Sequence, residues 1–286
     1  MSKKLFWMSH KLFWIRIPVA ILVIAALLIP GISAHAESTT VTVSGSQLSG
    51  DMRQRINICY RVNKDNGTLD ILVSGTDNEI VYRLTKDDTI YTYRWKSGEK
   101  AAIPLNMGSG DYELIVGAVI SETKAMVLWS ETLSVELYCE LIPYLNPSLI
   151  VNWTAEMRLA ETAKRLAIED NPKETALAIG RYISERFSYD YDITGLPSGY
   201  IPDLVKVYEC DKGICYDYAA LFAAMCREAG IPTKLVMGYS AYIGPEYHAW
   251  CLVMIDGEWH KFDPVYSMYR GVQFLCASMT IEVRLY

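Results

Sequence analysis

The fold is decided by the stretch Lys212-Gly213-Ile214-Cys215-Tyr216-Asp217-Tyr218-Ala219-Ala220. A glycine turn here delivers one cysteine to an apolar, alanine-rich segment, which predicts a helix from Cys215 to Ala229. Gly230 and Pro232 then give the usual signals of a helix C-terminus. A helix N-terminus carries unpaired N–H groups and a partial positive charge, so a thiol placed there ionises more easily. We therefore expect Cys215 to be the nucleophile if the chain is an enzyme.

Length and composition indicate one large or two ordinary globular domains. The chain has 286 residues, of which 51% are apolar and 21% charged, and this balance is that of a folded protein. Its formal net charge is −6. Nucleic-acid binding needs a basic patch that neutralises phosphates, and the acidic balance argues against it. We expect no nucleic-acid partner.

The first 36 residues predict a secretory signal peptide. A basic stretch ends at Arg16, an apolar run covers residues 17–29, and Ala34-His35-Ala36 has the small-x-small pattern of a cleavage site. The apolar run is shorter than the roughly 20 residues of a membrane-spanning helix. We expect a secreted or extracellular protein that is cleaved after Ala36. The sequence leaves open whether it associates with the cell surface or the cell wall. An uncleaved membrane anchor is the alternative.

Seven cysteines in an exported chain leave at least one of them unpaired. A pair between Cys210 and Cys215 is conceivable, and a bridge between Cys59 and Cys139 stays open. No C-x-x-C pair occurs, no His/Cys cluster has zinc spacing, and no calcium-loop pattern is present. We therefore expect neither a metal nor another cofactor.

Residues 37–140 predict a small all-β, sandwich-like domain. Seven segments of alternating, β-forming residues are separated by turn signals such as Asn66-Gly67 and Ser97-Gly98. Short strands at this spacing favour an antiparallel sandwich with a structural or binding role. The expected strands are Thr39–Val43, Arg55–Val62, Leu69–Ser74, Ile80–Thr85, Thr89–Trp95, Tyr112–Ile120 and Met126–Leu137.

Residues 141–286 predict a second domain of helices and strands. Pro143 and Pro147 mark a linker, after which the apolar period becomes helical. Helices are expected over residues 152–171, 175–187 and 201–208, in addition to the one that starts at Cys215. Strands are expected over residues 234–240, 247–255 and 258–263, and a short strand around residues 280–286 completes the domain unless the chain is cut short.

The strands expected over residues 247–255 and 258–263 form a hairpin, and this hairpin selects a base and an acid for the thiol. Beyond residue 36 only two histidines occur, His248 and His260. A two-residue turn at residues 256–257 pairs residue 253 with 260 and 250 with 263, and side chains alternate along each strand. Asp263 then lies diagonally across from His248 and can orient its ring toward Cys215, whereas His260 faces the other side. The alternative is that His248 is an ordinary sheet residue and Asp263 merely opens an Asp-Pro turn.

These segments resemble the core of the transglutaminase-like superfamily. The resemblance covers about residues 150–270 and rests on Lys212–Ala219, Ala229–Pro232, Tyr247–Trp250 and Gly257–Pro264. The family has a papain-like α+β core with a Cys, His, Asp triad in that chain order. The resemblance implies that Cys215 is the nucleophile, His248 the base and Asp263 the orienting acid, in agreement with the hairpin. We expect an α+β fold, with helices packed on an antiparallel sheet in this core and the all-β domain in front.

Other side chains are weaker candidates for residues of the site. Trp250 can shield the His248–Asp263 pair or line an acyl pocket, with plain packing as the alternative. The oxyanion of acyl transfer needs hydrogen-bond donors, for which the backbone N–H of Cys215 and the side chain of Tyr208 are candidates. Asp217 suits the dipole of the first helical turn, and we expect no catalytic role for it. Candidates that would only line the cleft are Tyr189, Tyr191 and Tyr239.

The resemblance implies acyl transfer from an amide through a thioester on Cys215. Water as the second substrate gives a peptidase or deamidase, and a lysine amine gives a transamidase; the shape of the pocket and the exclusion of water decide between them. We therefore expect an exported thiol enzyme that acts on amide bonds of proteins or peptides. The alternatives are a non-catalytic binding or scaffold protein with the same fold, and an unrelated papain-type or cell-wall cysteine peptidase.

Overall fold

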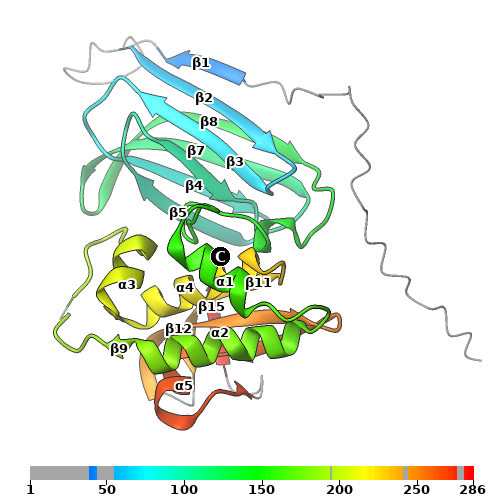
Figure 1. Cartoon of the computed structure of the whole chain (residues 1–286). Helices are drawn as coiled ribbons and strands as arrows, with labels where there is room; N and C mark the ends of the chain where they lie inside the picture. Colours follow the sequence, from blue (N-terminus) through cyan, green and yellow to red (C-terminus); the bar gives the residue numbers. More distant parts are fainter. Residues whose placement is uncertain (1–38, 44–54, 194, 241–243, 276–279) are drawn as a thin grey trace, which may run out of the picture. The chain divides into compact units, whose positions relative to one another are not determined.

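The computed structural model describes residues 39–43, 55–193, 195–240, 244–275 and 280–286. The predicted signal peptide lies outside these residues. Residues 36–286 form one compact unit, in which an all-β part is followed by helices packed on a further, five-stranded antiparallel sheet (Figure 1). The fold is therefore α+β, as the sequence predicts, while the domain boundary at residue 140 stays a prediction.

Two four-stranded antiparallel sheets make up the all-β part. One has the order β1 (Thr39–Val43), β2 (Ile56–Asn63), β3 (Thr68–Ser74), β6 (Lys100–Pro104), and the other β5 (Thr89–Trp95), β4 (Ile80–Lys86), β7 (Gly110–Ser121), β8 (Lys124–Val135). Alternate residues of the strands enter the core, as Ile56, Ile58 and Tyr60 of β2 do. All seven predicted strands are present. The sequence does not predict β6, whose short Lys-Ala-Ala-Ile-Pro run is poor in strand-forming residues.

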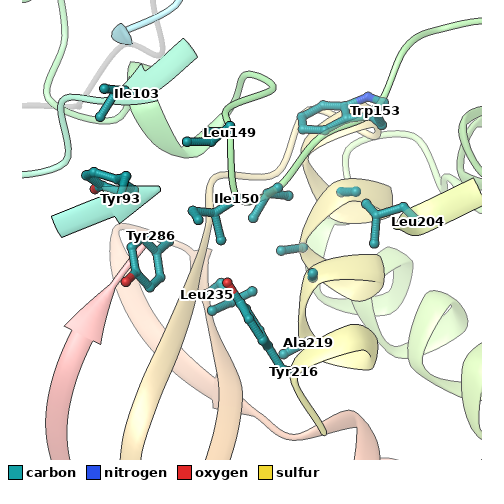
Figure 2. Close-up of a cluster of buried hydrophobic side chains, with 14 of the residues drawn as sticks. Tyr93, Ile103, Leu149, Ile150, Trp153, Leu204, Tyr216, Ala219, Leu235 and Tyr286 are labelled. Atoms are coloured by element: carbon teal, nitrogen blue, oxygen red, sulfur yellow. The ribbon is translucent and has the colours of Figure 1, made fainter. Parts of the chain in front are cut away.

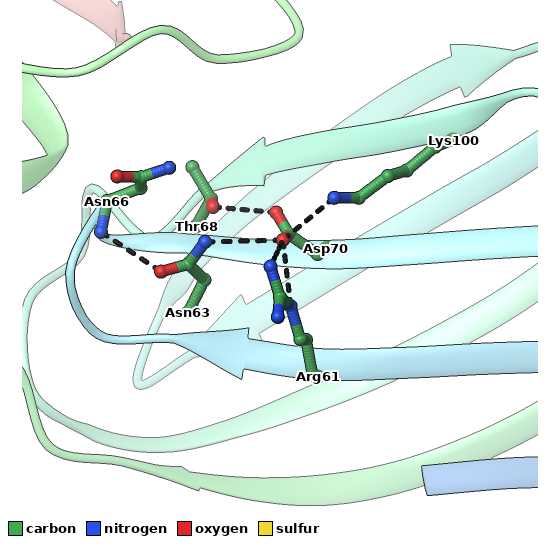
Figure 3. Close-up of polar contacts among 6 residues, drawn as sticks. All are labelled: Arg61, Asn63, Asn66, Thr68, Asp70 and Lys100. Atoms are coloured by element: carbon green, nitrogen blue, oxygen red, sulfur yellow. Dashed lines mark hydrogen bonds and ion pairs between the residues drawn. The ribbon is translucent and has the colours of Figure 1, made fainter. Parts of the chain in front are cut away.

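A network of hydrogen bonds around Asp70 ties β2, β3 and β6 together (Figure 3). Its Oδ2 atom accepts from Arg61, Asn63 and Lys100 at 3.0–3.3 Å, and its Oδ1 atom accepts from the Thr68 hydroxyl at 2.9 Å. Burial alone would raise the pKa of Asp70, but these donors outweigh it and lower the pKa. The buried carboxylate is thus fully satisfied by the strands around it.

The second part holds a five-stranded antiparallel sheet and the helices. The strand order is β14 (Phe274–Leu275), β13 (Glu258–Phe262), β12 (Gly244–Ile255), β11 (Thr233–Ser240), β15 (Thr280–Leu285). The predicted terminal strand is therefore present, as β15 at the edge beside β11. The helices are α1 (Arg158–Leu166), α2 (Pro172–Arg186), α3 (Leu204–Cys210), α4 (Cys215–Glu228) and α5 (Pro264–Arg270), with a short helix η2 (Ile142–Tyr144) in the linker. The sequence does not predict α5.

Helix α4 is the centre of this part. It contacts the other four α-helices and strands β11 and β12, and its residues from Tyr216 to Arg227 are all buried. A helix enclosed on every side must be apolar all round, which explains its alanine-rich sequence. The Phe222 ring stacks on Phe262 of β13 with 4.3 Å between ring centroids. Helix and sheet therefore share one core.

Arg227 closes the far end of α4 as a buried cation. Its guanidinium donates to the backbone carbonyls of Thr233 at 2.9 Å, Asn146 at 3.1 Å and Tyr286 at 2.9 Å. Burial lowers the pKa of Arg227 to about 10. Because the three carbonyls belong to β11, the linker and the chain end, one side chain holds three separate segments on the helix.

Among the described residues, no disulfide is formed by Cys139, Cys210, Cys215, Cys226 or Cys251. The two pairs left open by the sequence are therefore not bridged, and Cys276 lies outside the described residues. Among those residues no helix has the length and apolar character needed to cross a bilayer.

Candidate active site

The start of α4 is fixed by Asp217, which lies in its first turn. Its Oδ2 atom accepts from the backbone N–H of Ile214 at 2.9 Å, and its Oδ1 atom accepts from the Tyr200 hydroxyl at 2.6 Å. Burial raises the pKa of Asp217, although both hydrogen bonds act in the opposite direction. Cys215, partly exposed, is the first residue of the helix. The chain on both sides of the thiol is thus held by one buried carboxyl group.

The β12–β13 hairpin brings His248 and Asp263 together. Its register pairs Val253 with His260 and Cys251 with Phe262, as the two-residue turn predicts. His248 Nε2 lies 2.9 Å from Asp263 Oδ2, and both side chains are buried. The other oxygen, Oδ1, accepts from the backbone N–H of Tyr266 at 3.0 Å, so Asp263 also caps α5. Asp263 is therefore held in place by the helix that it begins.

The electrostatics of His248 favour its protonated form. Burial lowers its pKa, but hydrogen bonds to Asp263 and to the Cys215 side chain, together with the charges of both groups, raise the pKa to about 9. Since Nε2 faces Asp263, Nδ1 is the ring nitrogen left for the thiol. The structure thus joins the three predicted residues in the order Cys215, His248, Asp263.

A tyrosine that the sequence assigns only to the cleft lies against the thiol. Strands β9 (Ser188–Tyr189) and β10 (Lys212–Gly213) pair in parallel and place Tyr189 opposite Gly213. The Tyr189 hydroxyl lies next to the side chain and the backbone N–H of Cys215. Burial, followed by repulsion from the Cys215 charge, raises the pKa of Tyr189 to about 12. A neutral phenol with an available proton thus lies beside the sulfur.

Tyr208 has different neighbours from those that an oxyanion donor requires. Its hydroxyl is buried and lies 2.9 Å from the Thr162 hydroxyl and 2.7 Å from the Tyr182 hydroxyl. The Arg186 guanidinium stacks on its ring at 4.3 Å. These contacts place Tyr208 in the packing of α1, α2 and α3, whereas Tyr189 is the tyrosine that lies beside Cys215.

Trp250 is buried next to the triad. Its ring lies nearly parallel to the His248 ring, with 6.4 Å between centroids, and the Lys261 ammonium lies 4.4 Å from its centre on the other strand of the hairpin. This position suits the predicted shielding of the His248–Asp263 pair from water. Tyr191 lies next to Tyr189, with 4.9 Å between the centroids of their rings.

No group of three or more His, Cys, Asp or Glu side chains with metal-binding geometry occurs among the described residues. What the arrangement can do is donate and accept protons around one nucleophile. It contains a thiol, an oriented imidazole, a carboxylate and a phenol.

Residues 160–264 match the family model of the transglutaminase-like superfamily. An uncharacterized protein of Mycobacterium leprae is 27% identical over 158 residues, and kyphoscoliosis peptidase of Mus musculus is 29% identical over 103 residues. The match covers 52% of this chain and 54% of the mycobacterial protein, and 33% of this chain and 16% of the mouse peptidase. The chain thus spans about half of one relative and a small part of the other.

Solved structures of similar proteins include the periplasmic domain of TgpA from Pseudomonas aeruginosa and red sea bream transglutaminase. The first is 15% identical, with a TM-score of 0.36, and the alignment covers 83% of this chain and 87% of that one. The second is 12% identical, with a TM-score of 0.33, and the alignment covers 73% and 49%. The superpositions are loose, so the chemistry of this site is inferred from the sequence match and from the geometry of its residues.

Proposed function

We propose that this chain transfers acyl groups from amides through a thioester on Cys215. The match of residues 160–264 to the transglutaminase-like family model supports a cysteine enzyme in general. The observation that carries the proposal is the position of His248, whose Nε2 lies 2.9 Å from Asp263 Oδ2 and whose pKa is raised, despite burial, by Asp263 and by the neighbouring Cys215 side chain. This is the arrangement of nucleophile, base and orienting group that thiol catalysis requires.

The first half of the reaction forms the thioester. With a pKa of about 9, His248 is protonated at neutral pH. In the proposed mechanism the reacting form of Cys215 is the thiolate, which the neighbouring imidazolium stabilises. The sulfur attacks the carboxamide carbon, and the negative charge moves to the carbonyl oxygen. The Cys215 N–H and the Tyr189 hydroxyl are the donors next to this position. As the C–N bond breaks, the His248 proton goes to the leaving amine or ammonia.

The second half resolves the thioester. His248, now neutral, takes a proton from water or from a primary amine, whose oxygen or nitrogen attacks the thioester carbon. Collapse of the second tetrahedral intermediate returns the electron pair to sulfur and restores the imidazolium. Water gives hydrolysis, as in a peptidase or a deamidase, and an amine gives transamidation. We propose a protein or peptide as the acyl donor for both outcomes.

We further propose that the chain acts outside the cytoplasm. Support comes from the sequence alone: a basic start, an apolar run over residues 17–29 and the Ala34-His35-Ala36 cleavage pattern. Expression of the full chain and mass determination of the mature protein test this proposal. A chain that retains its first 36 residues would contradict cleavage.

The rival function is a non-catalytic binding or scaffold protein, and alkylation separates it from the enzyme. Iodoacetamide should label Cys215 at neutral pH much faster than an ordinary thiol, and His248→Ala should abolish the difference. Cys139, an exposed thiol on the same chain, is the internal control. A Cys215 that reacts no faster than Cys139 contradicts the proposed chemistry.

A glutamine-containing protein incubated with a labelled amine then identifies the reaction. Amine incorporation indicates transamidation, ammonia release alone indicates deamidation, and backbone fragments indicate a peptidase. Cys215→Ala is the control for each, because the thioester requires the sulfur.

A further inference from the structure

The backbone N–H of Cys215 is held in one direction by the residue in front of it. Cys215 is the first residue of α4, and the N–H groups of a first helical turn have no partner within the helix. The Ile214 carbonyl accepts from the Tyr218 N–H at 3.1 Å, and the Ile214 N–H donates to Asp217 Oδ2 at 2.9 Å. A trans peptide is planar, and its C=O and N–H point in opposite directions. Since the Ile214 carbonyl points into the helix, the Cys215 N–H points out of its start.

The Asp217 carboxyl group depends on its neighbours to stay in this place. It is only 2% exposed, and burial raises its pKa, so its ionised form needs hydrogen-bond donors. A Cβ at Gly213 would lie 3.0 Å from Asp217 Oδ2, which shows how closely the carboxyl group lies against the chain in front of the helix. The Ile214 N–H serves Oδ2. The other oxygen needs a donor of its own.

Tyr200 supplies this second donor. Its hydroxyl donates to Asp217 Oδ1 at 2.6 Å. Burial, followed by the bond to the carboxylate, raises the pKa of Tyr200, so the phenol keeps its proton at neutral pH. Its ring also meets that of Tyr216 with 6.1 Å between centroids and 67° between planes. Tyr200 thus contacts the residue that follows Cys215 and, through Asp217, holds the residue that precedes it.

The groups that support Tyr200 are themselves held in place. Figure 2 shows Tyr216 in a cluster of buried hydrophobic side chains that includes Leu235 of β11. On the other side, Gly199 has a φ of +79°, and a Cβ there would lie 3.1 Å from the Arg94 side chain of β5. The loop that carries Tyr200 therefore rests on the all-β part. A phenol held on both sides can fix a carboxyl group, whereas one on a free loop could not.

We propose that Tyr200 is a positioning residue of the candidate active site. It holds the Asp217 carboxylate, the carboxylate holds Ile214, and the peptide between Ile214 and Cys215 aims the Cys215 N–H at the carbonyl oxygen that gains negative charge. A donor aimed before the reaction stabilises this charge without reorganisation. The role of the N–H as an oxyanion donor rests on the proposed function, whereas the chain of hydrogen bonds from Tyr200 to Ile214 does not.

Two thiol reagents separate the aim of this N–H from the reactivity of the sulfur. p-Nitrophenyl acetate acylates a thiolate: the S–C bond forms, the carbonyl oxygen becomes an oxyanion, and p-nitrophenolate leaves as the C–O bond breaks. Iodoacetamide alkylates the same sulfur by displacing iodide, with no oxyanion. Labelling at Cys215 of the full chain is followed by mass spectrometry.

Tyr200→Phe keeps the ring and removes the hydroxyl. It should lower the rate of Cys215 acylation about tenfold, which is less than the loss of about a hundredfold or more when an oxyanion donor itself is removed. It should leave the rate of Cys215 alkylation within about twofold of that of the unchanged chain, because alkylation does not use the N–H.

Tyr60→Phe is the matched control. Tyr60 of β2 donates to the Glu131 carboxylate of β8 at 2.5 Å, so its replacement removes the same kind of hydrogen bond within the all-β part. A loss of stability would lower the melting temperature of both variants, but only Tyr200→Phe should change the ratio of acylation to alkylation. The proposal is overturned if the two variants have the same ratio, or if acylation and alkylation fall together in Tyr200→Phe.

A double variant tests the route from Tyr200 to the N–H. In a chain that carries Asp217→Asn the carboxylate is already lost, so Tyr200→Phe should lower the ratio by less than about twofold further. A full further loss would show that Tyr200 acts by another route and would overturn the proposal. Glutamine peptides separate this proposal from the proposed function. If no peptide is turned over while Tyr200→Phe still lowers the ratio, the proposed activity fails and the positioning role stands.

Discussion

Replacement of Asp263 by asparagine tests the link between the base and its orienting acid. Asparagine keeps an oxygen that can accept from the Tyr266 N–H and so can still cap α5. Its amide nitrogen replaces the oxygen that faces His248 Nε2 at 2.9 Å. The imidazole then loses its anionic partner and is driven to the tautomer that carries its proton on Nδ1, next to the thiol. The change is therefore local and electrostatic, with the fold preserved.

The rise of the His248 pKa from its ordinary value of 6.5 to about 9 sets the size of the effect. At about 1.4 kcal/mol per pKa unit it corresponds to roughly 3 kcal/mol in favour of the imidazolium. Asp263 and Cys215 share this stabilisation, which burial opposes. If Asp263 supplies between half and all of it, Asp263→Asn lowers the rate of Cys215 alkylation at neutral pH about tenfold to a hundredfold.

The pKa itself is measured by NMR titration of the histidine ring protons in a Cys215→Ala background, which removes the contribution of the thiolate. His248→Gln assigns the resonance. With Asp263 present, the pKa should stay above 6.5. In the double variant Cys215→Ala, Asp263→Asn, burial is the main remaining influence, and the pKa should fall below 6.5. A value above 6.5 in the double variant would refute the assignment of Asp263 as the group that holds the charge of His248.

Three further changes test the site and the core. Tyr189→Phe should lower kcat about a hundredfold. It should leave the rate of Cys215 alkylation by iodoacetamide within about twofold of that of the unchanged chain, because alkylation forms no oxyanion. An equal loss in both assays would contradict the oxyanion role. Gly180→Ala should reduce the free energy of unfolding in urea by about 1–3 kcal/mol, since its Cβ would overlap the Phe262 ring. Gly195→Ala is the control and should have little effect, because a Cβ added there would meet no heavy atom within 4 Å apart from its own chain neighbours. Arg227→Met should cost at least about 2 kcal/mol, because two buried carbonyls and one partly buried carbonyl lose their donor. An unchanged urea midpoint would show that these bonds contribute nothing.

The features that the sequence predicts well are those fixed by local rules. The turn at residues 256–257 sets the register of the hairpin, and strand parity then places His248 near Asp263, as the 2.9 Å contact shows. The helix that starts at Cys215 is likewise marked by the apolar run and the glycine after it. Neither inference needs knowledge of any distant contact.

The features that the sequence does not reveal depend on contacts between distant segments. Tyr189 reaches the thiol through a parallel pair of two-residue strands, which are too short to leave an alternating pattern. Tyr208 lies closer to Cys215 in the chain, yet its hydroxyl is taken by Thr162 and Tyr182. The position of a hydroxyl relative to a nucleophile is set by packing, and sequence distance says little about it.

Helix α5 shows how a signal can be interpreted correctly and still incompletely. An Asp-Pro pair ends a strand, as expected, but aspartate followed by proline is also a strong helix start, because proline suits the first helical position. Both interpretations hold at Asp263: β13 ends before it, and α5 begins after it. The sequence therefore contains the signal for the helix, because the Asp-Pro pair marks the start of the segment that follows it as well as the end of the strand before it.

Two carboxyl groups, each at a helix start, give the candidate site its geometry. Asp217 binds the backbone in front of α4 and so fixes the thiol, and Asp263 caps α5 while holding the imidazole. The relative position of the nucleophile and the base is therefore set by how α4 and α5 pack against each other and against the sheet. A change that shifts either helix without touching the triad should lower the rate of Cys215 alkylation while the His248–Asp263 contact survives. The proposed triad would account for the chemistry of a thioester, and the choice of acyl donor would then come from surfaces next to it.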